Sequence, residues 1–268
     1  MPDQDSPPPS TAGSVPRVLL LGGTAEARAL AAQLVCRGVP VLSSLAGRVG
    51  SPRLPEGEVR IGGFGGVAGL VAEVREGAFT HLVDATHPFA VTMRGHAVAA
   101  AEAAGVPVLR LARPGWRAHP DAGAWHWVDS YAAARVTAQR LGRRPFVTTG
   151  RQTLAHYLGW ADRDVLVRVV EPLDEPVPAR WTVLRDRGPY QLDSEVALLR
   201  EHRVDVLLTK DSGGSYTAAK LTAAAQLAVP VVVVTRPPAP PGLPEVSSID
   251  GVLTWLGVAA GHDPSDAE

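Results

Sequence analysis

Short, continuous runs of Val, Leu and Ile recur along this chain, and Ala-rich stretches separate them. A strand that is apolar at every position is buried on both faces, which is typical of a parallel sheet covered by helices. The spacing predicts strands at 17–23, 40–46, 58–63, 79–86, 106–114, 125–130, 144–150, 164–172, 181–187, 204–210 and 229–237. It predicts helices at 26–37, 67–76, 89–104, 131–141, 194–202, 216–227 and 248–256. The pattern therefore indicates an α/β protein.

The two halves of the chain resemble one another. The run VPVLRLARP begins at Val106 and VPVVVVTRP begins at Val229, and Thr86–His87 and Thr209–Lys210 precede these runs by equal distances. Any two strand–helix–strand units in an Ala- and Val-rich chain would look alike, so two interpretations stay open. One interpretation is chance similarity. On the other, the chain folds as two Rossmann-like parallel-sheet domains that face a central cleft, and His87 and Lys210 occupy equivalent strand ends. The expected domains are 16–114 and 115–258, with disordered tails at 1–15 and 259–268.

Composition excludes several classes of protein. The 268 residues carry a formal net charge of −1, which gives no global field to attract nucleic acid or an anionic membrane. The single cysteine excludes a disulfide framework, and the eight histidines form no ligand motif, so we expect no metal. No apolar run reaches the ~18 residues of a membrane span, and the Pro-rich N-terminus is unlike a signal peptide. We expect a cytoplasmic protein without nucleic-acid or membrane partners.

The first strand runs into a glycine turn. Gly22 and Gly23 allow the backbone to approach a phosphate closely, and Thr24 opens a helix whose N-terminus favours an anion. The turn lacks the third glycine of the dinucleotide fingerprint GxGxxG, and an ordinary tight connection would look similar. By itself the turn is a weak indication of a nucleotide site.

The residues after the second strand favour NADP over NAD. An NAD site usually has an acid there for the ribose hydroxyl, whereas this chain has Ser43, Ser44 and then Arg48. A carboxylate would repel a 2′-phosphate, and an arginine binds one, although Arg48 is equally compatible with an ordinary surface role.

Two further segments complete the predicted cofactor site. The glycine-rich segment 62–66 leaves little side chain to block a ligand, and the segment 84–87 ends the fourth strand at the same edge of the sheet. Each also has a plain structural interpretation, as a flexible loop and as a helix start that includes Pro88. The predicted NADPH-binding residues are Gly22, Gly23, Thr24, Ser43, Ser44, Arg48, Gly62, Gly63, Phe64, Asp84, Ala85 and Thr86.

Lysine is rare in this chain, since only Lys210 and Lys220 occur among the 26 basic residues. Lys210 ends a predicted strand and is followed by DSGGS, so a strand end, glycines and a helix start together suggest an anion site. Tyr216 and Lys220 also fit the YxxxK of short-chain dehydrogenases. The TGxxxGxG turn and the serine of that class are missing, so we interpret the match as a coincidence.

The motifs GGTAEAR (22–28), SSLAGRV (43–49), RIGGFGG (60–66), DATHPFA (84–90) and KDSGGSYTAAK (210–220) together resemble the precorrin-6A reductase family of cobalamin biosynthesis. The resemblance covers nearly the whole chain from about 17 to 256. It implies NADPH-dependent reduction of one double bond of a tetrapyrrole, precorrin-6A to precorrin-6B, with the substrate between two Rossmann-like domains.

Such a substrate carries many carboxylates, so we expect basic and hydroxyl groups around it, including Arg117. The predicted substrate-binding residues are His87, Arg113, Arg151, Lys210, Ser212, Gly213, Gly214, Ser215, Tyr216 and Lys220. The proton that accompanies the hydride comes from water, His87, Lys210 or Asp211, and the sequence does not choose among them. Neighbouring enzymes of the pathway are the expected partners for hand-over.

Two other classes stay open from the sequence: a short-chain NADP oxidoreductase and a non-catalytic NADP sensor. The sequence also leaves open whether the substrate carries cobalt.

Overall fold

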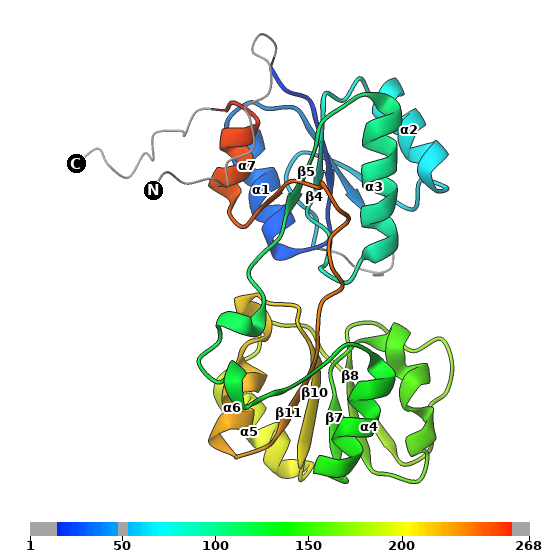
Figure 1. Cartoon of the computed structure of the whole chain (residues 1–268), viewed down its shortest axis with the longest axis vertical. Helices are drawn as coiled ribbons and strands as arrows, with labels where there is room; N and C mark the ends of the chain where they lie inside the picture. The colour runs from blue at the N-terminus through cyan, green and yellow to red at the C-terminus, as the bar shows by residue number, and fades with distance from the viewer. Residues whose placement is uncertain (1–14, 48–52, 259–268) are drawn as a thin grey trace, which may run out of the picture. The chain divides into compact units, whose positions relative to one another are not determined.

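The computed structural model describes residues 15–47 and 53–258. The chain divides into two units, which we describe separately: unit 1 runs up to Arg113 and resumes at Pro238, and unit 2 is Pro114–Pro237 (Figure 1). The expected tails, apart from Val15, and the predicted site residue Arg48 lie outside the described residues.

Unit 1 contains one parallel sheet in the order β12-β5-β4-β1-β2-β3. Its strands are β1 (Val18–Leu21), β2 (Val41–Leu45), β3 (Glu58–Ile61), β4 (His81–Asp84), β5 (Val108–Leu111) and β12 (Glu245–Val246). Helices α1 (Ala25–Cys36) and α7 (Ile249–Trp255) cover one face, and α2 (Val67–Glu76) and α3 (Val91–Ala104) cover the other (Figure 1). The central strand β1 is therefore at most 1% exposed, as its continuous apolar sequence requires.

The C-terminal segment belongs to unit 1, so the predicted domain 115–258 is wrong for its last part. β12 pairs with β5, and Glu245 accepts a hydrogen bond of 2.8 Å from buried Arg110. Val252 and Trp255 of α7 pack into the α1 face of the same sheet. A strand of two residues after a Pro-rich loop has no periodic pattern, so no local signal indicates this return.

Unit 2 also contains a six-stranded parallel sheet, in the order β6-β11-β10-β7-β8-β9. The strands are β6 (His126–Val128), β7 (Pro145–Val147), β8 (Val165–Val169), β9 (Trp181–Arg185), β10 (Val206–Lys210) and β11 (Val231–Val234). The helices are α4 (Tyr131–Leu141), α5 (Leu192–Glu201), α6 (Ala219–Gln226) and the 3₁₀ segments η1 (Trp116–Ala118), η2 (Ala122–Ala124), η3 (Arg151–Trp160) and η4 (Ser215–Thr217). The predicted class of two parallel-sheet α/β domains is confirmed.

The two sheets have equivalent topologies. When the strand orders are aligned, each strand from β1 to β5 matches the strand numbered six higher, so β1 matches β7 and β5 matches β11. Leu82 pairs with Leu19 and Val108, while Leu207 pairs with Phe146 and Val231. This register makes Gly150 the equivalent of Gly23, and both have positive φ, 93° and 109°. It makes Lys210 the equivalent of Ala85, so the expectation that Lys210 matches His87 is wrong by two residues.

Helix α3 begins at Val91, later than expected. The Ala90 N–H donates to the His87 carbonyl at 2.8 Å and closes a turn that contains Pro88, so the helix starts only after this turn.

Within the described ranges, none of the helices has the length and apolar character required to span a bilayer. The same residues contain no cluster of three or more His, Cys, Asp or Glu side chains that could hold a metal ion.

Candidate functional site

The predicted motifs of unit 1 meet at the carboxyl ends of β1 and β4. The chain leaves β1 for β2 on one side and returns to β4 on the other, so the strand order reverses between β1 and β4. In open α/β sheets, ligands bind in the crevice at this switch point. The turn Gly22–Thr24 follows β1 and the segment Ala85–His87 follows β4, which brings these predicted residues together.

The glycine turn leaves room for a ligand at one of its two glycines. A Cβ added to Gly23 would meet no atom within 4 Å, whereas one on Gly22 would lie 3.4 Å from the Ala27 Cβ. Thr24 caps α1, because its Oγ1 accepts from the Ala27 N–H at 3.1 Å, and the same hydroxyl donates to the Ala85 carbonyl at 2.9 Å. Open space above Gly23 at the start of α1 fits an anionic group.

Both predicted serines at the end of β2 are buried, and they point to opposite faces because successive residues of a strand alternate. Ser43 is 1% exposed, so its predicted contact with a cofactor is not supported, and that of Ser44, 6% exposed, stays a prediction. Ser44 pairs in register with Arg60, whose Nη1 lies 3.3 Å from the Ser44 hydroxyl. Arg60 was not among the predicted residues, although its position just before the glycine-rich segment could have indicated it.

Arg60 also organises the glycine-rich segment. Its guanidinium donates to the Gly62 carbonyl at 3.3 Å, stacks 4.0 Å from the centre of the Phe64 ring and pairs with Glu73 at 3.3 Å. A Cβ on Gly62 or Gly63 would meet nothing within 4 Å. The segment thus combines open backbone with a nearby cation.

Asp84 shapes the segment after β4 and does not present its carboxylate to the surface. Asp84 is 1% exposed, and its Oδ1 accepts from both the N–H and the hydroxyl of Thr86, at 3.0 and 2.6 Å. Its Oδ2 lies 3.5 Å from Nε of the fully buried Arg94. The predicted contact between Asp84 and a cofactor is therefore not supported, and Ala85, also 1% exposed, contributes its carbonyl to Thr24.

His87 is half-buried at the same edge. Its Nδ1 accepts from the Phe89 N–H at 3.2 Å. This bond assigns the proton of the neutral ring to Nε2, from which His87 can donate a hydrogen bond.

Unit 2 has its own switch point between β7 and β10, and there an ammonium group lies beside the glycine. A Cβ added to Gly150 would lie 3.8 Å from Nζ of Lys210. Burial lowers the pKa of Lys210 to about 8, which still leaves the group protonated at neutral pH. Unit 2 thus places a cation where unit 1 leaves open space.

The residues after Lys210 are held by neighbouring segments. Asp211 is 5% exposed, and its Oδ1 accepts from the Trp116 N–H at 2.6 Å while Oδ2 lies 3.3 Å from Arg236 Nε. A Cβ on Gly213 would lie 2.0 Å from the Pro114 carbonyl oxygen, so only glycine fits there. Asp211 is enclosed by these contacts, and its predicted role as a proton donor is not supported.

Lys220 lies inside unit 2, not on its surface. It is 4% exposed and donates to the Thr217 carbonyl at 3.0 Å, so its predicted contact with substrate is not supported. Burial, together with the nearby Arg168, lowers the pKa of Lys220 to about 7. Tyr216 is 43% exposed, so the Tyr and Lys of the YxxxK match do not share an environment.

Arg168 occupies in unit 2 the position that Ser44 has in unit 1. It forms a buried ion pair with Glu195 at 2.6 Å and stacks 4.1 Å from the centre of the Tyr190 ring. No sequence pattern indicates this pair, because burial of an arginine depends on the elements that cover it. The pair fills the region where a second nucleotide would place its ribose.

The predicted basic residues outside the turns are engaged in contacts of their own. Arg113 belongs to unit 1 and pairs with Glu26 at 2.8 Å. Arg151 pairs with Asp174 at 3.1 Å, and Arg117 stacks 4.0 Å from the centre of the Trp127 ring. Their contacts with substrate stay predictions, as do those of Ser212, Gly214 and Ser215.

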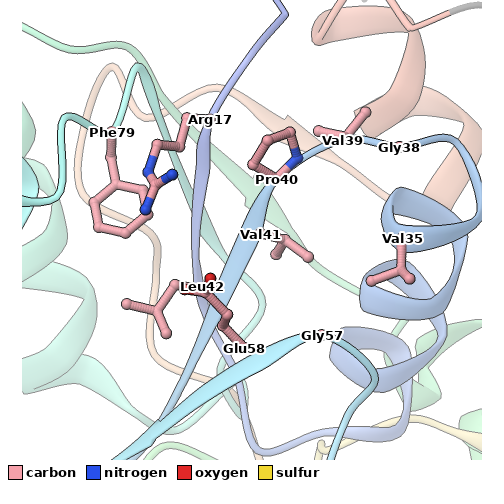
Figure 2. Close-up of a pocket in the computed structure, with 10 residues that line it drawn as sticks. All are labelled: Arg17, Val35, Gly38, Val39, Pro40, Val41, Leu42, Gly57, Glu58 and Phe79. Carbon is pink, nitrogen blue, oxygen red and sulfur yellow. The ribbon is translucent and has the colours of Figure 1, made fainter.

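A hollow of about 250 Å³ in unit 1 lies away from these motifs. Figure 2 shows its lining, with Arg17 against the Phe79 ring and Val39 to Leu42 at the start of β2. These residues mark the amino ends of the strands, the edge opposite the glycine turn. None of the predicted site residues lines it.

Comparison with known proteins identifies relatives over most of the chain. Residues 17–257 match the family described as "Precorrin-6x reductase CbiJ/CobK". The chain is 47% identical to a precorrin-6A reductase of Rhodococcus erythropolis, a match that covers 90% of this chain and 97% of that protein. It is 49% identical to a precorrin-6A reductase of Mycobacterium tuberculosis with the same coverage, 90% and 97%.

Two further comparisons bear on the substrate and the fold. A cobalt-precorrin-6A reductase of Salmonella typhimurium is 31% identical, over 82% of this chain and 87% of that protein. The solved structure called "CobK precorrin-6A reductase" superposes with a TM-score of 0.83 at 36% identity and covers 90% of this chain and 96% of that one.

Proposed function

This chain belongs to the precorrin-6x reductase family, and from that premise we propose that it reduces precorrin-6A to precorrin-6B with NADPH. The relatives of higher identity are called precorrin-6A reductases, and the cobalt-precorrin reductase of Salmonella typhimurium is less similar. We therefore propose the metal-free macrocycle as the preferred substrate.

The observation that carries the proposal is the difference between the two equivalent glycine turns. Gly23 has open space around it at the start of a long helix, as a pyrophosphate requires, whereas Gly150 lies beside the Lys210 ammonium. The Arg168–Glu195 pair also fills the ribose position of unit 2. This favours unit 1 for the dinucleotide and unit 2 for an anionic substrate.

The residues of unit 1 fit NADPH. The backbone of Gly23 and the N-terminus of α1 would hold the pyrophosphate, and the open glycines 62 and 63 would allow the adenosine half to lie against the backbone. Ser44 and Arg60, with the predicted Arg48, would hold the 2′-phosphate, since arginine binds phosphate through paired hydrogen bonds. When bound, NADPH supplies the hydride that the reduction consumes.

The residues of unit 2 would bind the carboxylates of the tetrapyrrole. Lys210 supplies the charge beside Gly150, and the backbone of Gly213 and Gly214 adds N–H donors in a segment that Asp211 holds in place. The Ser212 N–H donates to the Lys210 carbonyl at 2.6 Å, so Ser212 would contribute its hydroxyl. Tyr216 and Ser215 are exposed next to that segment.

Reduction of one double bond also consumes one proton. Among the predicted side-chain donors, His87 and Lys210 remain candidates because Asp211 is enclosed, and water is the third candidate. Donation by His87 would require the doubly protonated ring, so the hydrogen bond from the Phe89 N–H to Nδ1 would have to break first.

The direct test is oxidation of NADPH by the purified protein, followed at 340 nm, with metal-free or cobalt-loaded precorrin-6A. We expect turnover with the metal-free substrate and much slower turnover with the cobalt form. Absence of turnover with both, while NADPH still binds, would leave the protein as an NADP sensor. Unaltered hydride transfer in both Tyr216→Phe and Lys220→Met would remove the short-chain class.

A further inference from the structure

Arg94 is the one fully buried arginine among the described residues, and it lies beneath the segment that follows β4. It projects from α3, where its neighbours on the buried face are the small side chains of Ala97 and Ala101. Burial of a charge is costly unless the group is paired, and a buried ion pair is by itself weak evidence for stability. The contacts of Arg94 therefore say more about its role than its burial does.

The contacts of Arg94 all lead to the segment Asp84–Phe89. Its Nη2 donates to the Pro88 carbonyl at 2.8 Å, and its Nε lies 3.5 Å from Asp84 Oδ2. The other oxygen of Asp84 accepts both hydrogen bonds from Thr86. A single guanidinium group thus contacts this short segment at two points: it donates a hydrogen bond to the Pro88 carbonyl, and it forms an ion pair with Asp84, which in turn holds Thr86.

On the proposed function, the segment would lie at the reacting end of the cofactor. With the pyrophosphate at the turn after β1 and the adenosine half toward β2, the nicotinamide half would extend toward the end of β4. Thr86 and His87 are the partly exposed side chains there. A misplacement of about 1 Å between reacting groups can lower the rate about a hundredfold, so the conformation of this segment matters for the reaction.

We propose that Arg94 is a positioning residue for the reduction: through Asp84 and the Pro88 carbonyl it holds Thr86 and His87 in the conformation that receives the nicotinamide half of NADPH. The inference rests on the proposed function, because it assumes that NADPH binds at this switch point. It assigns to Arg94 no contact with the cofactor.

The test compares NADPH with 2′,5′-ADP, which has the adenosine half and no nicotinamide, by isothermal titration calorimetry. In Arg94→Met we expect the affinity for 2′,5′-ADP to stay within about twofold and the affinity for NADPH to fall about tenfold. Amide hydrogen exchange should become faster over residues 85–89. The matched control is Arg75→Met, which removes an exposed arginine that bonds to the Ala103 carbonyl on α3 and should change neither affinity.

Two further variants separate positioning from folding. Asp84→Asn/Arg94→Met removes both buried charges, so it should recover the melting temperature lost in Arg94→Met while NADPH affinity stays low. Arg94→Lys keeps the charge without the planar fork and should show an intermediate loss of NADPH affinity. These variants keep the proposal testable if Arg94→Met does not fold.

Three results would overturn the inference: equal loss of both affinities in the folded variants, a lower melting temperature with both affinities unchanged, or full recovery of NADPH affinity in the double variant. Failure of the wild-type protein to bind either compound would instead contradict the proposed cofactor, so the two failures are distinguishable.

Discussion

Lys210 is half-buried and Lys220 is buried, and their surroundings give them different roles. Lys210 lies beside the Gly150 turn at a strand end, while Lys220 faces a backbone carbonyl inside unit 2. Burial lowers the pKa of both groups, to about 8 and about 7. Lys210 is therefore mostly charged at pH 7, whereas Lys220 is protonated in only about half of the molecules at that pH.

The charge of Lys210 should control substrate affinity. We expect tetrapyrrole binding to weaken as the pH rises from 7 to 9. Lys210 deprotonates near its pKa of about 8, and the substrate carboxylate then loses its charged partner. Lys210→Ala should weaken binding at pH 7 by about tenfold to a hundredfold, since a hydrogen bond to a charged group contributes about 1.5–3 kcal/mol. Equilibrium titration with precorrin-6A at pH 7 and pH 9 measures the change in affinity.

Lys210→Arg is the matched control, because arginine stays charged at pH 9 and should remove the pH dependence. NADPH affinity should stay within about twofold in all these variants. A collapse of NADPH binding with intact tetrapyrrole binding would reverse the assignment of the two units.

Lys220 should make unit 2 less stable near neutral pH than at higher pH. Its pKa falls from 10.5 in the unfolded chain to about 7, so between these values the unfolded state binds more protons and stability rises with pH. Lys220→Met should raise the free energy of unfolding at pH 7 and flatten its increase between pH 7 and 9. Urea titrations at the two pH values test this, and an unchanged slope in the variant would show that another group is responsible.

At the scale of elements, the site depends on turns at the carboxyl ends of strands, not on the strands themselves. The equivalent turns at Gly23 and Gly150 share a backbone conformation and differ in what lies above them. The β1–α1 turn can therefore be tested by filling the open space at Gly23.

Gly23→Val should abolish NADPH binding while unit 1 stays folded. The added side chain would occupy the space above the turn, and a side chain at φ 109° adds strain of about 1–3 kcal/mol. Gly38→Val controls for strain, because Gly38 also has positive φ, 66°, and open space but lies at the amino edge of the sheet (Figure 2). Gly38→Val should lower the melting temperature without changing the affinity for NADPH. An affinity that is unchanged in Gly23→Val as well would place the cofactor elsewhere.

At the scale of the whole molecule, unit 1 is assembled from both ends of the chain. Val252, Leu253, Trp255 and Leu256 are at most 6% exposed and complete the α1 face of its core. Burial of such side chains contributes about 1.5–3 kcal/mol each, and together this approaches the total stability of a typical domain.

Truncation after Pro237 should therefore unfold unit 1 and leave unit 2 folded. Calorimetry should show the loss of one transition, and NADPH binding should disappear with it. The full-length Trp255→Ala variant, which removes one of these side chains, should lower the same transition only. Loss of the unit 2 transition on truncation would contradict the assignment of the C-terminal segment.

Much of this protein follows from local sequence. Continuous apolar strands and Ala-rich helices appear at the predicted places because periodicity is a property of neighbouring residues, and the motif order was sufficient to indicate the family. Other features depend on contacts between distant segments. Asp84, Asp211 and Lys220 have the residue types of a reaction site, and only the elements that cover them make them structural. Likewise, the return of β12 to β5 and the approach of Lys210 to Gly150 join residues far apart in the chain, which no local pattern encodes.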